Sequence, residues 1–327
     1  MSTFRVASEK SWKSEKAFQM DMKTYRNDSV AVSRLGLGCM RMSMMPDQQR
    51  SESVATIHAA LEAGINLLNT GDFYGQDGHN EILIGEALKS VDRDKAFISL
   101  KYGTFQNAFT GSNKVDVGPQ NVKTYITTSL KRLGLDYVDL YQPARVDIGI
   151  PVEDTVGAIA DLVEAGYVRN VGLSETDAET IRKAHATHPL SLVEFAYSIT
   201  DTSIEESILP TARELGIGIV AFGAMGFGKL SDAKGDPLMV TLRHMAADKD
   251  ISIAQLLHGW LLAKGEDIIP LAGARTTAQL EDTLQSLDLS LTDEDLNRIE
   301  TARNASELVG RSMPNMVIKN GVLLEQD

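Results

Sequence analysis

Short apolar, β-rich runs alternate along the chain with amphipathic segments of helical period. Near-continuous apolar runs are typical of parallel strands that are covered on both faces. The eight runs are Leu35–Met40, Asn66–Asn69, Ala96–Leu100, Val138–Gln142, Val168–Gly172, Ser191–Phe195, Gly218–Phe222 and Ile268–Leu271. No linker rich in Pro, Gly or Ser divides the chain, so the pattern favours one (β/α)8 barrel over two Rossmann halves. Residues 1–327 are therefore predicted to form a single α/β domain.

Helix-ending signals support this division of the chain. The segment Glu52–Glu62 is followed by Gly64, and the segment Gln120–Arg132 is followed by Gly134. Glycine just beyond the last periodic residue is a frequent helix end, because it adopts the left-handed conformation without strain.

Two terminal segments, residues 1–32 and 288–327, fall outside the eight repeats. We expect them to be additions that pack on the barrel or are partly mobile, with residues 1–22 as the candidate mobile extension. Thr292–Thr301 is predicted to be an extra helix, because the Thr at its start and the Asp three positions later form a capping pattern.

The composition is that of a globular protein, with 43% apolar and 24% charged residues among 327. The formal net charge of -13 argues against nucleic acid and anionic membranes as partners, because both demand clustered Lys and Arg. No apolar stretch of about 18 residues is present, so we expect neither an export signal nor a membrane span. One cysteine, Cys39, excludes an intrachain disulfide and a multi-cysteine metal site, which fits a cytoplasmic protein without a metal.

Candidate chemistry lies where two consecutive apolar runs end. One run leads into Asn69–Gly75, with the sequence NTGDFYG, and the next closes at Lys101. Neighbouring parallel strands lie about 4.8 Å apart, so Tyr74 and Lys101 are expected at the same rim of the barrel. A nearby positive charge favours the phenolate of a tyrosine, whose ordinary pKa is about 10. The pair is therefore predicted to be a general acid for a carbonyl oxygen that gains negative charge under hydride attack.

These segments resemble the fingerprint of the aldo-keto reductases, D-T-A-x-x-Y-G, then a strand ending in Lys, then a strand ending in L-x-x-H-R. The resemblance extends from about Thr24 to Glu300 and departs at two positions. Asn69 stands where the family has a catalytic Asp, and Ala144 stands where it has His. The strings N-x-G-x-F-Y-G, A-R-V-D and G-L-S-E resemble the pyridoxal reductase branch of the family.

The two departures have chemical consequences. Asn69 can hydrogen-bond Lys101 but not neutralise it, which leaves the full ammonium charge to act on Tyr74 and predicts an equal or lower pKa for the phenol. Desolvation of an uncompensated lysine acts the other way, so the direction depends on burial. Ala144 removes a donor to the carbonyl, a loss on the order of 10²-fold or more in rate. We hypothesise that the ortho hydroxyl of an aromatic aldehyde such as pyridoxal, or a bound water, completes the hydrogen bonding.

The resemblance also implies a nicotinamide across the barrel mouth. It assigns Ser174 and Glu175 to the carboxamide, Glu194 to a further contact with it, and Phe222 to an aromatic platform under the ring. Glu175, Glu194 and Phe222 replace Asn, Gln and Tyr of the family pattern. Carboxylates still accept from an amide N–H, and the phenyl ring keeps a stacking surface.

Anion binding is predicted at Leu271–Asp282, where a strand gives way to a helix. Helix N-termini attract phosphate, and Arg275 could fork onto a 2′-phosphate, which favours NADP(H) over NAD(H). The resemblance implies that Gln279 and Asp282 flank the adenosine, while Thr283 replaces the Asn that contacts adenine.

Several other side chains have two readings. Lys229, in the Gly-rich loop after the seventh run, is either a pyrophosphate clamp or a solvated lysine. Arg145 and Asp147 are interpreted as a strand-end ion pair that locks loops. Tyr102 is a candidate for the wall of the substrate pocket, and Trp260 is interpreted as core.

The leading hypothesis is an enzyme that reduces an aldehyde or ketone with NADPH, with a small-molecule carbonyl substrate and pyridoxal as a specific guess. Tyr74 would be the proton donor and Lys101 would tune it. An alternative is an NADP(H)-binding, redox-sensing or regulatory protein with slow turnover. A third reading is a Schiff-base aldolase that uses Lys101.

Overall fold

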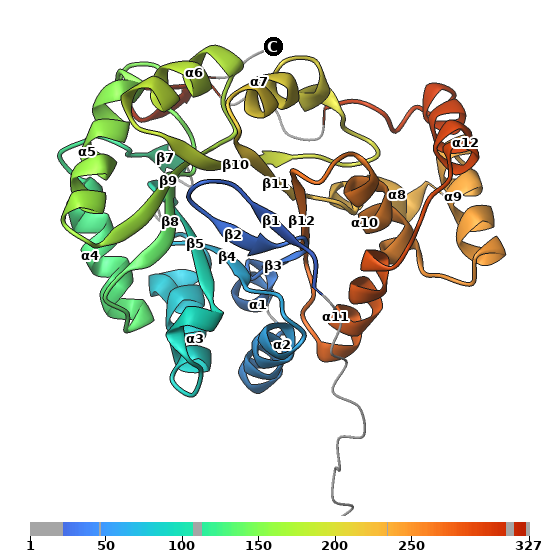
Figure 1. The fold of residues 1–327 in the computed structure, drawn as a ribbon, viewed down its shortest axis with the longest axis horizontal. Helices are drawn as coiled ribbons and strands as arrows, with labels where there is room; N and C mark the ends of the chain where they lie inside the picture. The colour runs from blue at the N-terminus through green and yellow to red at the C-terminus, as the bar shows by residue number, and fades with distance from the viewer. Residues whose placement is uncertain (1–21, 46, 107–112, 234, 312–316, 325–327) are drawn as a thin grey trace, which may run out of the picture.

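Eight parallel strands close into a barrel in the order β10-β11-β12-β3-β4-β5-β8-β9 (Figure 1). The computed structural model describes residues 22–45, 47–106, 113–233, 235–311 and 317–324. The barrel strands are β3 (Gly36–Gly38), β4 (Leu67–Gly71), β5 (Phe97–Tyr102), β8 (Val138–Pro143), β9 (Val168–Ser174), β10 (Leu190–Ala196), β11 (Gly218–Phe222) and β12 (Ile268–Ala272). The predicted (β/α)8 barrel and its eight strands are confirmed, whereas the candidate mobile extension lies outside the described residues except for Met22.

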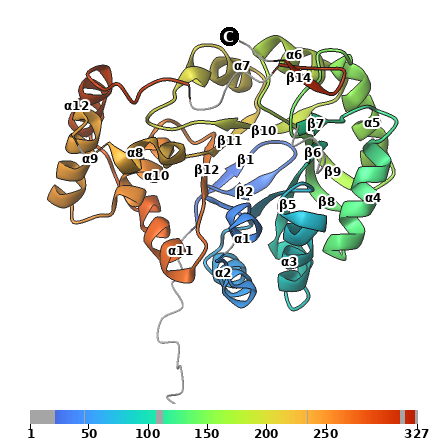
Figure 2. The ribbon, with the colours of Figure 1, turned by 180° about the vertical axis from the view of Figure 1, so that it is seen from behind.

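Helices form the outer layer around the strands (Figures 1 and 2). They are α1 (Arg41–Met44), α2 (Arg50–Glu62), α3 (His79–Leu88), α4 (Val122–Leu133), α5 (Val152–Glu164), α6 (Ala178–Thr187), α7 (Ile208–Glu214), α8 (Lys229–Asp232), α9 (Pro237–Asp248), α10 (Ile253–Ala263), α11 (Thr277–Leu284) and α12 (Asp293–Asn304). The predicted glycine ends are confirmed, since Gly64 and Gly134 have φ of 90° and 67°. None of these helices combines the length and the apolar character needed to cross a membrane.

Helix α12 confirms the predicted extra helix near the C-terminus. The amide of Asp295 donates to the Thr292 hydroxyl at 3.2 Å, and the Asp295 carboxylate accepts from the Thr292 amide at 2.9 Å. These reciprocal bonds satisfy two amides that the first turn of a helix leaves free. The helix lies beside α9 at the edge of the molecule (Figure 1).

The N-terminal end of the barrel is closed by a β-hairpin. Strands β1 (Thr24–Arg26) and β2 (Ala31–Ser33) lie across the strand starts (Figure 1), where Val32 is fully buried. The inner side chains that pack with this hairpin are Leu67, Phe97, Leu140, Leu192, Val220, Ile269 and Leu271. This end of the barrel is apolar and sealed, which leaves the C-terminal rim as the end open to chemistry.

A second small sheet joins the C-terminal segment to the loop after β5. Strands β13 (Val317–Lys319) and β14 (Val322–Leu324) pair with β7 (Asn113–Val115) and β6 (Thr104–Gln106) in the order β13-β14-β7-β6 (Figure 2). The described parts of both terminal segments therefore pack on the barrel.

Two helical glycines provide a test of how closely the outer helices approach each other. A Cβ at Gly85 in α3 would come within 2.3 Å of the Leu133 carbonyl oxygen at the end of α4, whereas a Cβ at Gly157 in α5 would meet no atom within 4 Å. We expect Gly85→Ala to lower the free energy of unfolding by about 1–3 kcal/mol through overpacking. The matched Gly157→Ala should raise it by up to about 1 kcal/mol, because alanine is the better helix former. Urea unfolding followed by circular dichroism measures both values, and equal effects of the two substitutions would contradict the close approach.

Candidate active site

Tyr74 and Lys101 meet at the C-terminal rim of the barrel. Gly71 at the end of β4 is in register with Lys101 on β5, and the Asp72 amide donates to the Lys101 carbonyl at 2.9 Å. The Tyr74 amide then donates back to Gly71 at 3.0 Å, which forms the tight turn that carries the phenol. The Lys101 Nζ atom lies 5.4 Å from the centroid of the Tyr74 ring. The structure thus places the two side chains together, as the sequence predicts.

A buried polar network surrounds the Lys101 ammonium. Lys101 Nζ donates to Asn69 Oδ1 and to Glu194 Oε1, each at 2.7 Å. The other carboxylate oxygen of Glu194 accepts from Asn69 Nδ2 at 2.7 Å and from Gln142 Nε2 at 2.8 Å. The Ser99 hydroxyl accepts longer bonds from both amides, at 3.4 and 3.3 Å. No member is more than 4% exposed, so the network lies inside the barrel.

The ammonium of Lys101 is therefore compensated, contrary to the expectation from Asn69 alone. Burial lowers the pKa of Lys101, but the Glu194 carboxylate and the Tyr74 hydroxyl more than offset this effect, and the pKa stands above its ordinary value. Lys101 is held in its protonated form.

The pKa of Tyr74 is also raised, so of the two opposing effects that the sequence left open, the effect of burial prevails. Burial is the largest cause, because the phenolate would lie in a poorly solvated position. Lys101 lowers the pKa, Glu194 raises it, and Arg145 lowers it slightly. The sequence could not give the degree of burial, and its pattern did not connect the negative charge of Glu194 with Lys101.

Three of the four side chains assigned to the nicotinamide lie at the ends of β9 and β11, two strands that flank β10. The Ser174 hydroxyl is buried and has no hydrogen-bond partner within the described chain. Glu175 follows it with φ of 49°, and its carboxylate accepts from the Ala196 amide at 2.6 Å. Phe222 is half-buried and meets Phe227 edge-on at 5.8 Å. Glu194, in contrast, is directed into the network around Lys101.

A helix, α11, begins where the sequence predicts an anion site, and Arg275 just before it already has a contact within the protein. Thr276 caps the helix by accepting from the Gln279 amide at 3.2 Å, and the Gln279 side chain accepts from the Arg275 amide at 2.9 Å. The Arg275 guanidinium contacts the Asp47 carboxylate at 3.1 Å, and Asp47 is 72% exposed. The guanidinium that the sequence assigns to a phosphate is thus held by an exposed partner.

Two other side chains assigned to the cofactor are already engaged within the protein. Lys229 Nζ donates to the carbonyls of Gly310 and Arg311 at 3.1 and 3.3 Å, so it holds the C-terminal segment rather than standing free as a clamp. Asp282 accepts hydrogen bonds at 2.7 Å from the side chains of Ser252 and Gln255 on α10. The hydroxyl of Thr283 donates to the Gln279 carbonyl of its own helix at 3.0 Å.

The expected ion pair between Arg145 and Asp147 is not formed. Arg145 donates to the Ala144 carbonyl at 2.6 Å, whereas the Asp147 carboxylate accepts from the amides of Asn320 and Gly321 at 2.8 and 2.6 Å. The Asp147 carboxylate is therefore occupied by backbone amides of the β13–β14 turn, and it fixes this hairpin instead of pairing with Arg145.

Tyr102 is core, and its assignment to the pocket wall is wrong. It is fully buried and stacks on Tyr141 with ring centroids 4.4 Å apart. Trp260 is 2% exposed, which confirms its interpretation as core.

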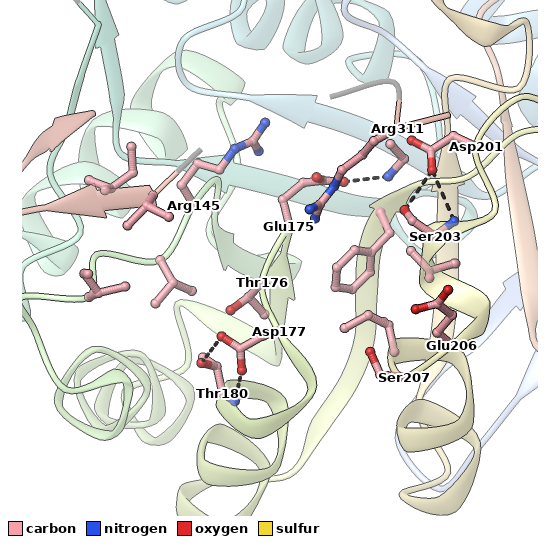
Figure 3. A pocket seen from close by; sticks show the side chains of 18 residues that line it. Arg145, Glu175, Thr176, Asp177, Thr180, Asp201, Ser203, Glu206, Ser207 and Arg311 are labelled. Atoms are coloured by element: carbon pink, nitrogen blue, oxygen red, sulfur yellow. Dashed lines mark hydrogen bonds between the residues drawn. The ribbon is translucent and has the colours of Figure 1, made fainter. Parts of the chain in front are cut away.

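A cavity of about 450 Å³ opens beside the strand ends (Figure 3). Its lining includes Arg145, Glu175, Arg311, Asp201 and Glu206, and Arg311 lies between Glu175 and Asp201 in Figure 3. Tyr74 and Lys101 do not line this cavity. The cavity shares Arg145 and Glu175 with the candidate active site. Because Tyr74 is absent from its lining, it is not the place where the Tyr74 hydroxyl would meet a substrate.

Gln142 and Ser99 are members of the network that sequence reasoning missed. Each stands two positions after an inward apolar residue, Leu140 or Phe97, on the same strand. Side chains two apart on a strand share a face. A polar residue two positions after an inward apolar residue was therefore the signal in the sequence that could have placed Gln142 and Ser99 inside the barrel.

The Aldo/keto reductase family model matches residues 34–304. The chain belongs to this family. It is 34% identical over 305 residues to the probable aldo-keto reductase 1 of Glycine max, which spans 85% of this chain and 88% of that protein. The expected family is confirmed, and the protein is an oxidoreductase of a family that generally reduces carbonyls with NADP(H).

Solved aldo-keto reductase structures resemble this chain as well. The glycerol dehydrogenase of Gluconobacter oxydans is 25% identical with a TM-score of 0.78, over 89% of this chain and 98% of that one. A thermostable aldo-keto reductase in complex with the inhibitor epalrestat is 26% identical with a TM-score of 0.75, over 86% of this chain and 100% of that one.

The turn between Asn69 and Tyr74 should make the stability of this aldo-keto reductase depend on pH. Burial raises the pKa of Asp72 to about 7; the Glu81 charge adds to the rise, and a bond from the Gly103 amide and the Arg132 charge oppose it. Between about pH 4 and 7 the folded protein therefore binds a proton that the unfolded chain has lost, so stability falls as pH rises through this window.

We expect Asp72→Asn to remove that fall, which is on the order of 2–4 kcal/mol, because the amide does not titrate. Urea unfolding between pH 4 and 8 measures the effect. Asp28→Asn, at an exposed turn position, is the matched control and should keep the wild-type slope. Identical slopes for Asp72→Asn and the wild type would show that the carboxyl is not desolvated.

Proposed function

We propose that this protein reduces an aldehyde or ketone to an alcohol with NADPH, and that Tyr74 donates the proton. The observation that carries the proposal is the buried, protonated Lys101 whose Nζ lies 5.4 Å from the Tyr74 ring centroid at the open end of the barrel. An aromatic aldehyde of the pyridoxal type is the substrate that we favour. Its support is the combination of three short sequence strings with the small side chain of Ala144.

The residues present fit a nicotinamide nucleotide. The Ser174 hydroxyl is a buried polar atom that lacks a partner in the described chain, as expected of a group that awaits a ligand. Glu175 follows β9 and Phe222 ends β11, with β10 between these strands, and the two side chains offer an acceptor and an aromatic face. The start of α11 with Arg275 suits a 2′-phosphate, which favours NADP(H). The bound cofactor would supply the hydride.

The chain itself supplies the proton and the charge balance. The Tyr74 hydroxyl donates its hydrogen to the substrate oxygen as negative charge develops there, and the Lys101 ammonium stabilises the phenolate left behind. A Schiff-base reaction needs a neutral amine, and the raised pKa of Lys101 disfavours that reading. Ala144 offers no donor side chain, so a hydroxyl of the substrate or a water molecule completes the hydrogen bonding of the carbonyl oxygen.

Two relatives bear on the direction and the class of the reaction. The glycerol dehydrogenase relative is named for an alcohol substrate, and carbonyl reduction is the same chemistry in reverse. The Glycine max relative is named only as a probable aldo-keto reductase, which agrees with a carbonyl substrate without narrowing it.

The proposal is tested by following NADPH oxidation with a panel of aldehydes and ketones that includes pyridoxal. We expect Tyr74→Phe to lower kcat by at least about 10²-fold while NADPH still quenches protein fluorescence with unchanged affinity. Tyr141→Phe is the matched control, because its hydroxyl is buried without a partner in the described chain and its removal should leave turnover intact. Full turnover by Tyr74→Phe, or no oxidation with any carbonyl, would overturn the proposed function.

The cofactor preference depends on Arg275. We expect Arg275→Met to raise the KM for NADPH roughly 10- to 100-fold and to leave the KM for NADH unchanged, because only NADPH carries the 2′-phosphate. Asp47→Asn should lower the KM for NADPH about two- to five-fold, since it frees Arg275 from an exposed ion pair. Arg298→Met removes a comparable exposed pair on α12 and is the control. Equal effects of Arg275→Met on both cofactors would refute the assignment.

A further inference from the structure

The negative charge that balances Lys101 comes from the far side of the barrel. Lys101 lies on β5 and Glu194 on β10, which is three strands away in the barrel order β5-β8-β9-β10. The two side chains cross the interior and meet with Nζ 2.7 Å from Oε1. Counted over the side-chain atoms alone, they are 5% and 3% exposed, so water screens neither charge.

The Glu194 carboxylate is fully committed to this network. One oxygen accepts from Lys101, and the other accepts from Asn69 Nδ2 and Gln142 Nε2. A buried carboxylate is tolerated only when it is paired and hydrogen-bonded in this way. Its position is therefore determined by Lys101 and the two amides.

The neutral amide of Asn69 and the carboxylate of Glu194 complement each other in charge and in hydrogen bonding. The Asn69 amide accepts from Lys101 through Oδ1 and donates to Glu194 through Nδ2. A carboxylate at position 69 could accept from Lys101 but could not donate to Glu194, and two carboxylates 2.7 Å apart would repel each other. A charge at position 194 thus requires a neutral side chain at position 69.

We propose that Glu194 is a positioning residue that sets the protonation of the Tyr74–Lys101 pair, with Asn69 as the neutral bridge between the ammonium and the carboxylate. Glu194 acts through Lys101 and does not itself donate the proton. The inference rests on the proposed function, in which this pair is the proton donor.

The other charged or titratable groups around the pair are few and remain unchanged when Glu194 is replaced. Arg145 follows β8 and acts on both Tyr74 and Glu194, and Glu175 follows β9 and acts on Arg145 and Glu194. The thiol of Cys39, after β3, is neutral because burial raises its pKa to about 12.

In Glu194→Gln, the Tyr74–Lys101 pair should lose its first proton at a lower pH than in the wild type. Without the carboxylate, burial of Lys101 is no longer offset, and the negative charge that disfavours the Tyr74 phenolate is also gone. Both effects have the same sign. In the carbonyl-reduction direction, kcat declines at high pH as the pair loses its first proton, and this decline is the basic limb of the pH profile. We expect the midpoint of the basic limb to move to lower pH by roughly one to three pH units.

The exchanged variant Asn69→Asp/Glu194→Gln places the carboxylate on β4 instead of β10. We expect it to return the basic limb to within about half a unit of the wild type, because Lys101 again has an anionic partner. Asn69→Asp alone adds a second carboxylate beside Glu194 and should not behave like the exchange. Glu205→Gln is the matched control: Glu205 contacts Lys264 at 2.8 Å and accepts from Tyr197 at 2.6 Å away from this network, and its loss should leave the limb in place.

A second measurement does not need turnover. The absorbance of tyrosinate is titrated with pH for each variant and for the same variant carrying Tyr74→Phe, and the difference reports Tyr74 alone. We expect this titration to be displaced in Glu194→Gln and to recover in the exchange. If the wild type reduces no carbonyl, the proposed function fails while this titration still decides the inference.

If the basic limb of kcat against pH and the Tyr74 titration are both unchanged in Glu194→Gln, the inference is overturned. If Glu194→Gln does not fold, the exchange decides, since it keeps the total charge. A folded exchange variant with a wild-type Tyr74 titration supports the proposal, and one with a displaced titration refutes it.

Discussion

The candidate site depends on one buried ion pair, between Lys101 and Glu194. Moving an ammonium and a carboxylate out of water costs several kcal/mol per ion, and their attraction offsets this only when the remaining polar atoms are also satisfied. Asn69 and Gln142 supply that satisfaction, since their two amide donors and one amide acceptor contact the two charges at 2.7–2.8 Å. The pair keeps Lys101 charged where burial alone would neutralise it, and a charged Lys101 is what makes Tyr74 a credible proton donor.

The barrel separates this polar layer from an apolar one by a simple alternation. Leu67 precedes Asn69 by two positions, and Leu192 likewise precedes Glu194, so the inner face of each strand changes from apolar to polar toward its C-terminal end. The β1–β2 hairpin seals the apolar end. Water and substrate can therefore approach only from the rim where Tyr74 lies.

Signals that are local along the chain allowed the sequence to predict much of this arrangement. The eight strands follow from short apolar runs, and the meeting of Tyr74 with Lys101 follows because their strands are consecutive in the chain and neighbours in the barrel. The partner of Lys101 could not be predicted in this way. Glu194 is 93 residues away and is brought to Lys101 by closure of the barrel and by the reach of its side chain. The partners of Asp282 and Lys229 within the protein could not be predicted for the same reason, since they come from α10 and from the C-terminal segment.

Charge balance in the interior also bears on how an anionic cofactor can approach this chain. The Lys101–Glu194 pair is neutral as a unit, so it adds no net attraction for phosphate, and the whole chain carries a formal charge of -13 that repels anions at long range. Attraction must then be local, and the start of α11 with Arg275 provides it through a positive helix end and a guanidinium. The contact of Arg275 with Asp47 opposes binding only weakly, because an exposed ion pair contributes about 1 kcal/mol or less. Under the proposed NADPH specificity, a 2′-phosphate would bind the same guanidinium through two hydrogen bonds and replace a weak partner with a stronger one, so an acidic protein would still bind an anionic cofactor at this site.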